Sequence, residues 1–258
     1  MKRIITLLFC VGIFMLIFTA CAAEQPYQQY KGAYRQLKGE KSVVIEQNWA
    51  VKNSQKIIDS VEEYNSFMQV TWQVVQDGNG DMAIANFVIK SVDNNPITVN
   101  SYYRNGYLYT QNTANPEENY RQKKKEDFAR SLVLEGIIDF PQRVIARQSI
   151  QDTDQGRLIT FELDSEKYYN YHFHVTSKEY SYGEFSTYRE PPVYTVLLDQ
   201  QGRIKQVTGH FCTVNADEAA FTMEQSYTIT FTQYGDVVLD FPELDDEDFP
   251  LLEAPPKK

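Results

Sequence analysis

The sequence predicts a mainly β fold of the α+β class, an antiparallel sheet with one or two helices packed on it. Apolar and polar residues alternate along residues 70–74 and 227–232, as in strands with one buried and one solvent-facing side. Turn sequences separate such stretches; Asn105-Gly106, for example, suits the positive φ angles of a tight hairpin. Neighbouring strands should therefore run antiparallel. Further turns of this kind are expected at residues 77–81, 199–202 and 235–236.

One helix is predicted at residues 115–135. Asn115 can cap its start, Pro116 suits the first helical position, and two glutamates follow where the helix dipole favours negative charge. Gly136 is the expected stop.

The segment at residues 164–181 has two interpretations. Apolar alternation favours a strand, whereas Asp164 or Ser165 could cap a helix. Aromatic residues are also crowded here, in a chain with 18 tyrosines. They could form a surface for an acyl chain or a sugar, or could simply suit strands, which we favour. The aromatic residues are Tyr168, Tyr169, Tyr171, Phe173, Tyr180, Tyr182, Phe185 and Tyr188.

The first twenty residues have the three parts of a signal peptide. Lys2 and Arg3 form a short basic start, residues 4–20 contain no charged side chain, and small residues precede Cys21. The apolar run is shorter than the ~20 residues of a comfortable membrane span. We therefore predict that residues 1–20 direct export.

The end of this leader resembles the lipobox of bacterial lipoproteins. Phe18, Thr19 and Ala20 precede Cys21, although the family usually has leucine where Phe18 stands. The resemblance implies lipidation of Cys21 by a diacylglyceryl group with palmitate-like chains, and cleavage just before it. The run from Ala20 to Ala22 also fits an ordinary signal-peptidase site, and an uncleaved anchor helix is a third alternative. All three predict export, and the lipobox places the protein at the extracytoplasmic side of the cell membrane.

Three segments are predicted after the leader. Residues 21–41 are polar and indicate a lipidated tether that could include a short helix. Residues 42–242 form the antiparallel β-rich domain. Residues 243–258 combine acidic residues with prolines, a composition typical of a loose tail.

Composition restricts the partners. The formal net charge is −10, and loss of Lys2 and Arg3 with the leader would make it −12. Such a protein repels nucleic-acid phosphates and gains no attraction from anionic lipid headgroups. Cys212 is the one cysteine left beside Cys21 in the mature chain, so no internal disulfide is expected.

Two acidic turns and a histidine pair are the candidate metal sites. Residues 77–81 begin like a calcium loop, but Met82 and Val88 stand where an EF-hand needs glycine and glutamate, and residues 152–156 fail likewise. His172 and His174 would share a strand face at a spacing that suits zinc or copper. The neighbouring sequence offers no obvious third ligand, so we predict no metal or cofactor.

A catalytic site is also not predicted. Cys212 and His210 would share a strand face, as a thiol protease could use, but ordinary strand residues surround them. A small buried cysteine is the favoured interpretation. No sequence pattern of a serine hydrolase, zinc protease or phosphate-binding loop is present.

The closing strands give a second resemblance. Tyr227, Phe231 and the run at residues 234–242 (YGDVVLDFP) look like the last strands of exported lipoproteins with a LolA/LppX-like fold. This resemblance spans roughly residues 42–242 and implies a strongly curved half-barrel that wraps helices and encloses an apolar cavity for lipid. No motif transfers individual ligand-binding residues.

These observations together lead to one expected function with two alternatives. We expect a non-catalytic, membrane-anchored lipoprotein that binds an apolar ligand, or an apolar partner surface, in the concavity of its sheet. A structural or protein-interaction lipoprotein without a small-molecule site is the first alternative, and an envelope hydrolase is the second.

Overall fold

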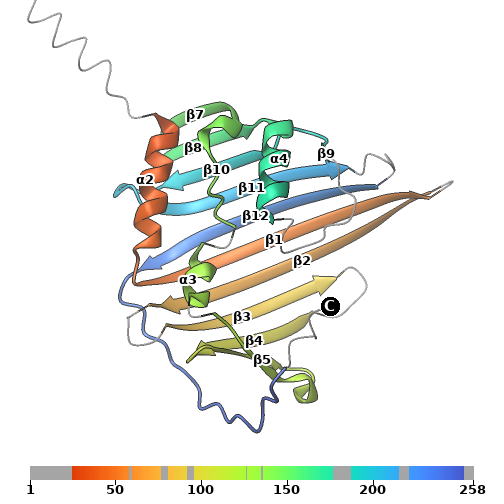
Figure 1. Cartoon of the computed structure of the whole chain (residues 1–258), viewed down its shortest axis with the longest axis vertical. Coiled ribbons are helices and arrows are strands. Elements are labelled where there is room, and N and C mark those ends of the chain that lie inside the picture. Colours follow the sequence, from red (N-terminus) through yellow and green to blue (C-terminus); the bar gives the residue numbers. More distant parts are fainter. Residues whose placement is uncertain are drawn as a thin grey trace, which may run out of the picture.

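One large antiparallel sheet dominates the computed structural model (Figure 1). The structure describes residues 25–57, 60–76, 81–91, 96–125, 127–134, 136–176, 187–214 and 221–252. The twelve strands follow the order β6-β5-β4-β3-β2-β1-β12-β11-β10-β8-β7, with β9 paired to β11. The sheet is open and curved, which confirms the predicted fold class.

The strands lengthen toward the middle of the sheet. The two central strands, β1 and β2, have 16 residues each. The strands are β1 Ser42–Ile57, β2 Ser60–Val75, β3 Met82–Ser91, β4 Ile97–Arg104, β5 Tyr107–Asn112, β6 Tyr120–Lys123, β7 Ile145–Thr153, β8 Gly156–Leu163, β9 Thr187–Tyr188, β10 Val193–Leu198, β11 Ile204–Val214 and β12 Phe221–Tyr234.

The hairpins predicted at residues 105–106 and 199–202 are present. The closing hairpin predicted at residues 235–242 is wrong, because β12 is already paired with β1 and β11 and residues 236–242 form no strand. Asn105 and Gly106 have φ angles of 52° and 79° between β4 and β5, as a tight primed turn requires. Gly202 (φ 78°) turns the chain from β10 to β11. Val75 pairs with Met82 across the β2–β3 connection, whose residues 77–80 lie outside the described part.

The two faces of the sheet differ in chemistry. The face covered by helices α2, α3 and α4, here the inner face, carries the apolar members of each alternation (Figure 1). The outer face carries polar rows, in which Asn86 donates to Asn100 and Asn100 donates to Gln111. One face is therefore core and the other faces water, as the alternation predicted.

Helix α2 (Pro26–Lys38) corrects the predicted tether at residues 21–41. The sequence analysis allowed a short helix here, but as part of a spacer. Instead, Tyr30 (0% exposed) and Leu37 (2%) are buried in the core. Tyr27, Ala33 and Tyr34 join them on the same face, so burial of an apolar stripe stabilises the helix and makes it part of the domain.

The long helix predicted at residues 115–135 is wrong. Residues Pro116–Glu118 form one 3-10 turn (η1), and Tyr120–Lys123 form edge strand β6, paired with β5. Of the described residues in this range, those that are α-helical are Phe128–Val133 (α3), and residues 126 and 135 lie outside the described part. The capping residues favoured a helix start, but backbone pairing with the neighbouring strand prevailed over this local preference.

Helix α4 (Ser165–Thr176) settles the described part of the ambiguous segment in favour of a helix. Asp164 caps it by accepting a hydrogen bond from the Lys167 N–H (3.0 Å), and this bond and the Lys167 ammonium lower the pKa of the Asp164 carboxyl. Residues 177–181 lie outside the described part. A second 3-10 turn, η2 (Gln142–Val144), leads into β7.

Residues 243–252 correct the described part of the tail predicted at residues 243–258, and residues 253–258 lie outside the described part. Phe249 (4% exposed) packs edge-on against Tyr109 with ring centroids 5.4 Å apart. Asp246 accepts a hydrogen bond from the Tyr109 hydroxyl (3.1 Å) and forms an ion pair with Arg121. Two anchoring contacts within an acidic segment are enough to dock it on the outer face of β5 and β6.

Candidate ligand-binding face

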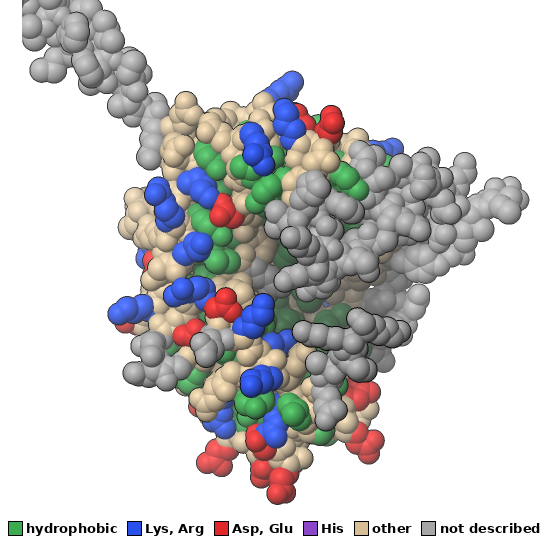
Figure 2. Space-filling model, in the orientation of Figure 1, with side chains coloured by type: hydrophobic (Ala, Val, Ile, Leu, Met, Phe, Trp, Pro, Cys, Tyr) green, Lys and Arg blue, Asp and Glu red, His purple; other side chains and the backbone are tan. Residues whose placement is uncertain are grey.

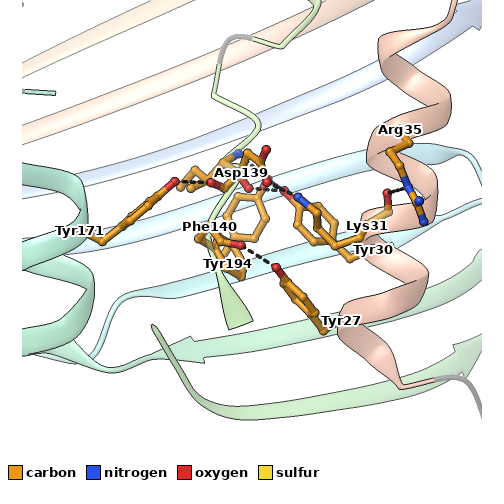
Figure 3. Close-up of polar contacts among 9 residues, drawn as sticks. Tyr27, Tyr30, Lys31, Arg35, Asp139, Phe140, Tyr171 and Tyr194 are labelled. Atoms are coloured by element: carbon orange, nitrogen blue, oxygen red, sulfur yellow. Dashed lines mark hydrogen bonds and ion pairs between the residues drawn. The ribbon is translucent and has the colours of Figure 1, made fainter. Parts of the chain in front are cut away.

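A short segment crosses the inner face between α3 and β7, here called the crossing segment (residues 136–141). Five tyrosine side chains bind its backbone, four of which are shown in Figure 3. The fifth, Tyr227 of β12, donates to the Gly136 carbonyl (2.9 Å). Tyr27 and Tyr30 of α2 donate to the carbonyls of Phe140 and Ile138, and Tyr171 of α4 donates to the carbonyl of Asp139. The hydroxyl of Tyr194 in β10 accepts from the Ile138 N–H (3.1 Å).

These contacts explain part of the high tyrosine content. Burial raises the pKa of the Tyr30 and Tyr194 hydroxyls well above the ordinary value, so both stay protonated near neutral pH. Their rings pack around Phe140, which lies 5.6 Å from Tyr30 and 5.5 Å from Tyr194 between centroids. The tyrosines satisfy an otherwise buried irregular backbone, a role that the sequence analysis did not anticipate.

Strand register arranges the inner face of the central strands into rows. Two rows are fully buried beneath the helices: Val43, Val74, Ala83 and Tyr103; then Ile45, Trp72, Ala85 and Ser101. The next two rows are Ile229, Gln47, Val70, Phe87 and Val99; then Tyr227, Trp49, Met68, Ile89 and Ile97.

The side chains become more exposed from the first row to the fourth, but most of them remain apolar. Phe87 and Val99 are half-buried in the third row, and Ile89 and Ile97 are 39% and 44% exposed in the fourth. We call the open part of the last two rows the distal surface (Trp49, Met68, Phe87, Ile89, Ile97 and Val99). Figure 2 shows apolar side chains in a hollow of this face.

Aromatic stacking supports the boundary between the buried rows and the distal surface. Trp49 stacks on Tyr227 with centroids 4.4 Å apart, and Trp72 packs edge-on against Phe87 at 5.2 Å. Gly136 of the crossing segment comes so close that a Cβ there would lie 2.4 Å from Ile229 and 3.2 Å from Trp49. The rim of the cover is therefore closely packed.

Charged residues are unevenly distributed. Lys and Arg gather along α2 and α3 on the helix-covered face (Figure 2), where Arg35, Lys38 and Arg130 are exposed. Asp and Glu gather around the C-terminal segment, where Asp245 and Asp248 are exposed. The helix-covered face therefore carries a group of exposed basic side chains, although the net charge of the whole chain is negative.

A separate hollow of about 400 Å³ lies on the outer face of β1, β2 and β12. Lys52, Lys90 and Glu224 line it beside Phe67. It is open and of mixed polarity, so it is a weaker candidate for an apolar ligand than the distal surface.

The candidate histidines lie on two elements, residues 172 and 174 on α4 and His210, with Cys212, on β11. Residues 172 and 174 belong to α4, where positions two apart do not share a face, so the strand argument for a metal pair fails. His210 lies 3.9 Å from Glu224 on the outer side of the sheet. Burial raises the pKa of the half-buried Cys212 thiol, which disfavours the nucleophilic thiolate.

Two further findings concern metals and membranes. Among the described residues, no group of three or more His, Cys, Asp or Glu side chains is arranged to hold a metal ion. Within the same ranges no helix has the length and apolar character needed to cross a membrane. Cys21 lies outside the described residues, and its predicted lipidation stays a prediction.

The distal surface was missed from the sequence, although a signal was present. In β1 the inner-face residues Ile45 and Trp49 stand on either side of the polar run Glu46–Asn48, so the sequence gives only a partial signal of the inner face. What could not be read is where the covering helices end.

Comparisons with solved structures found distant likenesses. A DUF1329 family protein from Desulfovibrio piger is 10% identical, covering 80% of this chain and 92% of its own, with a TM-score of 0.28. A LolA superfamily protein from Nitrosomonas europaea is 10% identical, covering 83% and 96%, with a TM-score of 0.25. A β-barrel-like DUF1849 protein from Brucella abortus is 8% identical, covering 76% and 100%, with a TM-score of 0.24.

No family model matches the chain, and neither does any curated protein sequence. At these TM-scores the likenesses carry no argument about this chain.

Proposed function

We propose that this protein is an extracytoplasmic lipoprotein, tethered through Cys21, that binds an apolar ligand on its distal surface without catalysing a reaction. The proposal rests on one observation: large apolar side chains on the inner face are left exposed. Ile89 and Ile97 are exposed side by side in register, next to half-buried Met68 and Phe87.

Contiguous exposed apolar surface is uncommon on monomeric proteins and marks interaction sites. Its removal from water by a ligand gains roughly 25 cal/mol per Å² of apolar area. Helices and stacked aromatic rings already cover the buried rows next to the distal surface. A ligand can therefore cover the distal surface without unfolding of the protein. The surface is therefore suited to a long apolar chain lying across the strands.

The place of α2 supports a short tether. Cys21 precedes Pro26 by five positions, a stretch of at most about 18 Å when fully extended. An acylated Cys21 would therefore hold α2 close to the bilayer. The exposed Lys and Arg residues on the helix-covered face would then meet anionic headgroups, contrary to what the net charge suggested.

Native mass spectrometry of residues 22–258, purified from cells without detergent, tests the binding function. We expect co-purifying lipid, and displacement of a fluorescent apolar probe from the protein by long-chain compounds. Ile89→Glu should abolish probe binding because it places a charge within the distal surface. Gln69→Glu adds the same charge at an exposed outer-face position of β2 and should leave binding unchanged. Equal binding by both variants would contradict the proposal.

Anchoring is tested by replacing Cys21 with alanine in the full chain. The protein should move from the membrane fraction to the soluble extracytoplasmic fraction, and metabolic labelling with a fatty acid should disappear. Cys212→Ala is the matched control, and it should keep both label and membrane location. An unlabelled natural protein would refute the tether but would leave the binding function standing.

A further inference from the structure

A polar hollow of about 530 Å³ lies between α2 and two turns of the sheet, the β7–β8 hairpin and the β10–β11 turn. Figure 1 shows α2 beside the ends of β8 and β10 that these turns join. The volume lies within the ~300–1,000 Å³ that is usual for small-ligand pockets. We call it the α2 hollow, and its wall includes Gln29, Gly32 and Gln36 of α2, Arg157 of β8 and Gln200 of the β10–β11 turn.

Gly32 stands in the interior of the 13-residue helix α2, where glycine destabilises a helix relative to alanine. The fold gives no reason for a glycine at this position. The φ angle of Gly32 is not positive, and a Cβ added there would meet no heavy atom of the described residues within 4 Å. The missing side chain instead leaves helix backbone uncovered at the wall of the hollow, as is found where a ligand approaches a backbone closely.

The polar side chains around the α2 hollow are held in place by the protein. The guanidinium of Arg157 donates to Oε1 of Gln29 (3.0 Å) and to Oδ1 of Asp152 (2.9 Å), and so links α2 to the β7–β8 hairpin. Asp199 accepts from the backbone N–H and from Nε of Arg203, both at 2.8 Å, which fixes the β10–β11 turn. A ligand would therefore meet walls that are already formed, and little affinity would be lost in ordering them.

The charges at the hollow are balanced. Its two carboxylates, Asp152 and Asp199, form ion pairs with Arg157 and Arg203. An anionic ligand would meet the carboxylates and a cationic ligand the guanidinium groups, so neither sign of charge gains a net attraction. The hollow therefore suits an uncharged ligand.

The lining offers hydrogen bonds more than apolar area. Ala33 and Leu198 are almost fully buried, each 4% exposed. The side chains of Gln36 and Gln200 are exposed, and a carboxamide both donates and accepts. Sugar hydroxyls also donate and accept, so they match these amides. A peptide would instead need a strand edge or apolar side-chain pockets, whereas these walls are a helix and two turns.

We propose that the α2 hollow binds an uncharged oligosaccharide. The bare backbone at Gly32 gives a sugar ring room to approach α2, and the carboxamides of Gln36 and Gln200 bind its hydroxyls from opposite walls. The hollow shares no residue with the distal surface. It adds a second class of ligand, and it does not depend on the proposed binding of an apolar molecule.

The test is an NMR titration of the full chain carrying Cys21→Ala with maltotriose and with chitotriose. We expect saturable shifts of the Gly32 amide signal and of the Gln36 and Gln200 carboxamide signals. Gly32→Leu should weaken binding at least tenfold, because its side chain fills the hollow. Gln28→Leu, at an exposed position of α2 outside the hollow, is the matched control and should leave binding unchanged.

A second variant keeps the test valid if Gly32→Leu is damaged. Gly32→Ala removes the helix penalty of glycine without a clash, so its thermal midpoint should rise by about 2–4 °C. Binding of the sugars should nevertheless weaken about threefold or more. A residue needed by the fold alone would not show this combination of higher stability and weaker binding.

Four results would overturn the proposal. They are the absence of a saturable shift with either sugar, unchanged binding by both Gly32 variants, a lower thermal midpoint for Gly32→Ala, and tighter binding of a comparison probe than of the sugars. The comparison probes are trigalacturonate, which is anionic, and acetyl-trialanine amide, which is a peptide. Each of these results would leave the apolar binding function of the distal surface standing.

Discussion

The buried and open parts of the inner face are built from the same strands, yet they serve different ends. Tyr30 of α2 and Phe140 close the buried part. The Tyr30 hydroxyl donates to the Ile138 carbonyl, and the Phe140 carbonyl accepts from the Tyr27 hydroxyl. Ile89 and Ile97 continue the apolar pattern where no described helix lies over it. The difference shows that the apolar pattern of these strands extends further than the core requires.

Phe140→Ala should have the largest effect on the stability of the buried part. Phe140 (1% exposed) contacts Tyr27, Tyr30, Phe161 and Tyr194, so truncation leaves a cavity at the centre of the aromatic cluster. We expect a loss of about 3–5 kcal/mol in the free energy of unfolding, measured by urea denaturation. A loss below about 1 kcal/mol would show that the crossing segment does not hold the buried part together.

Alkaline pH should destabilise the same buried part of the inner face. Burial raises the pKa of the Tyr30, Tyr168, Tyr194 and Tyr227 hydroxyls in the folded protein, whereas the unfolded chain titrates near pH 10. Above that pH the unfolded state binds fewer protons, so stability is complete below about pH 10 and falls as pH rises further.

The measurement is the urea midpoint between pH 8 and pH 11. Tyr194→Phe should make the alkaline fall shallower, at the cost of leaving the Ile138 N–H without its acceptor. A midpoint that does not change across pH 10 would contradict the burial of these hydroxyls.

The smallest effect on stability is expected from Ile97→Ser. This side chain is the first residue of β4 and is 44% exposed, so the free energy of unfolding should change by less than about 1 kcal/mol. Displacement of the apolar probe should nevertheless weaken several-fold. Together with Phe140→Ala, this variant separates residues that stabilise the fold from residues that serve binding.

Much of the sheet could be predicted from the sequence because strands and hairpins are local signals. The alternation at residues 227–232 and the Asn105-Gly106 turn were enough to give the antiparallel architecture. The helix at residues 115–135 was wrong because β6 is set by pairing with a neighbouring strand. Burial of α2 and docking of Phe249 likewise depend on surfaces formed by distant parts of the chain.

The candidate site was less predictable for the same reason. Gln47 lies within the polar run Glu46–Asn48 and gives no signal of an inner-face position by itself. Its proximity to Trp72 depends on the β1–β2 register, which composition does not give. The tyrosines were noticed as an excess, but their role in binding the crossing segment follows only from the assembled fold.

The C-terminal segment has a consequence for self-association. The carbonyl of Pro250 accepts from the Arg121 N–H (3.0 Å), and the Leu252 N–H donates to the Arg121 carbonyl (2.8 Å). The last residues thereby occupy hydrogen-bonding groups that β6 would otherwise offer to a strand of another molecule. Where molecules meet at high concentration, such occupancy keeps neighbouring sheets from joining edge to edge.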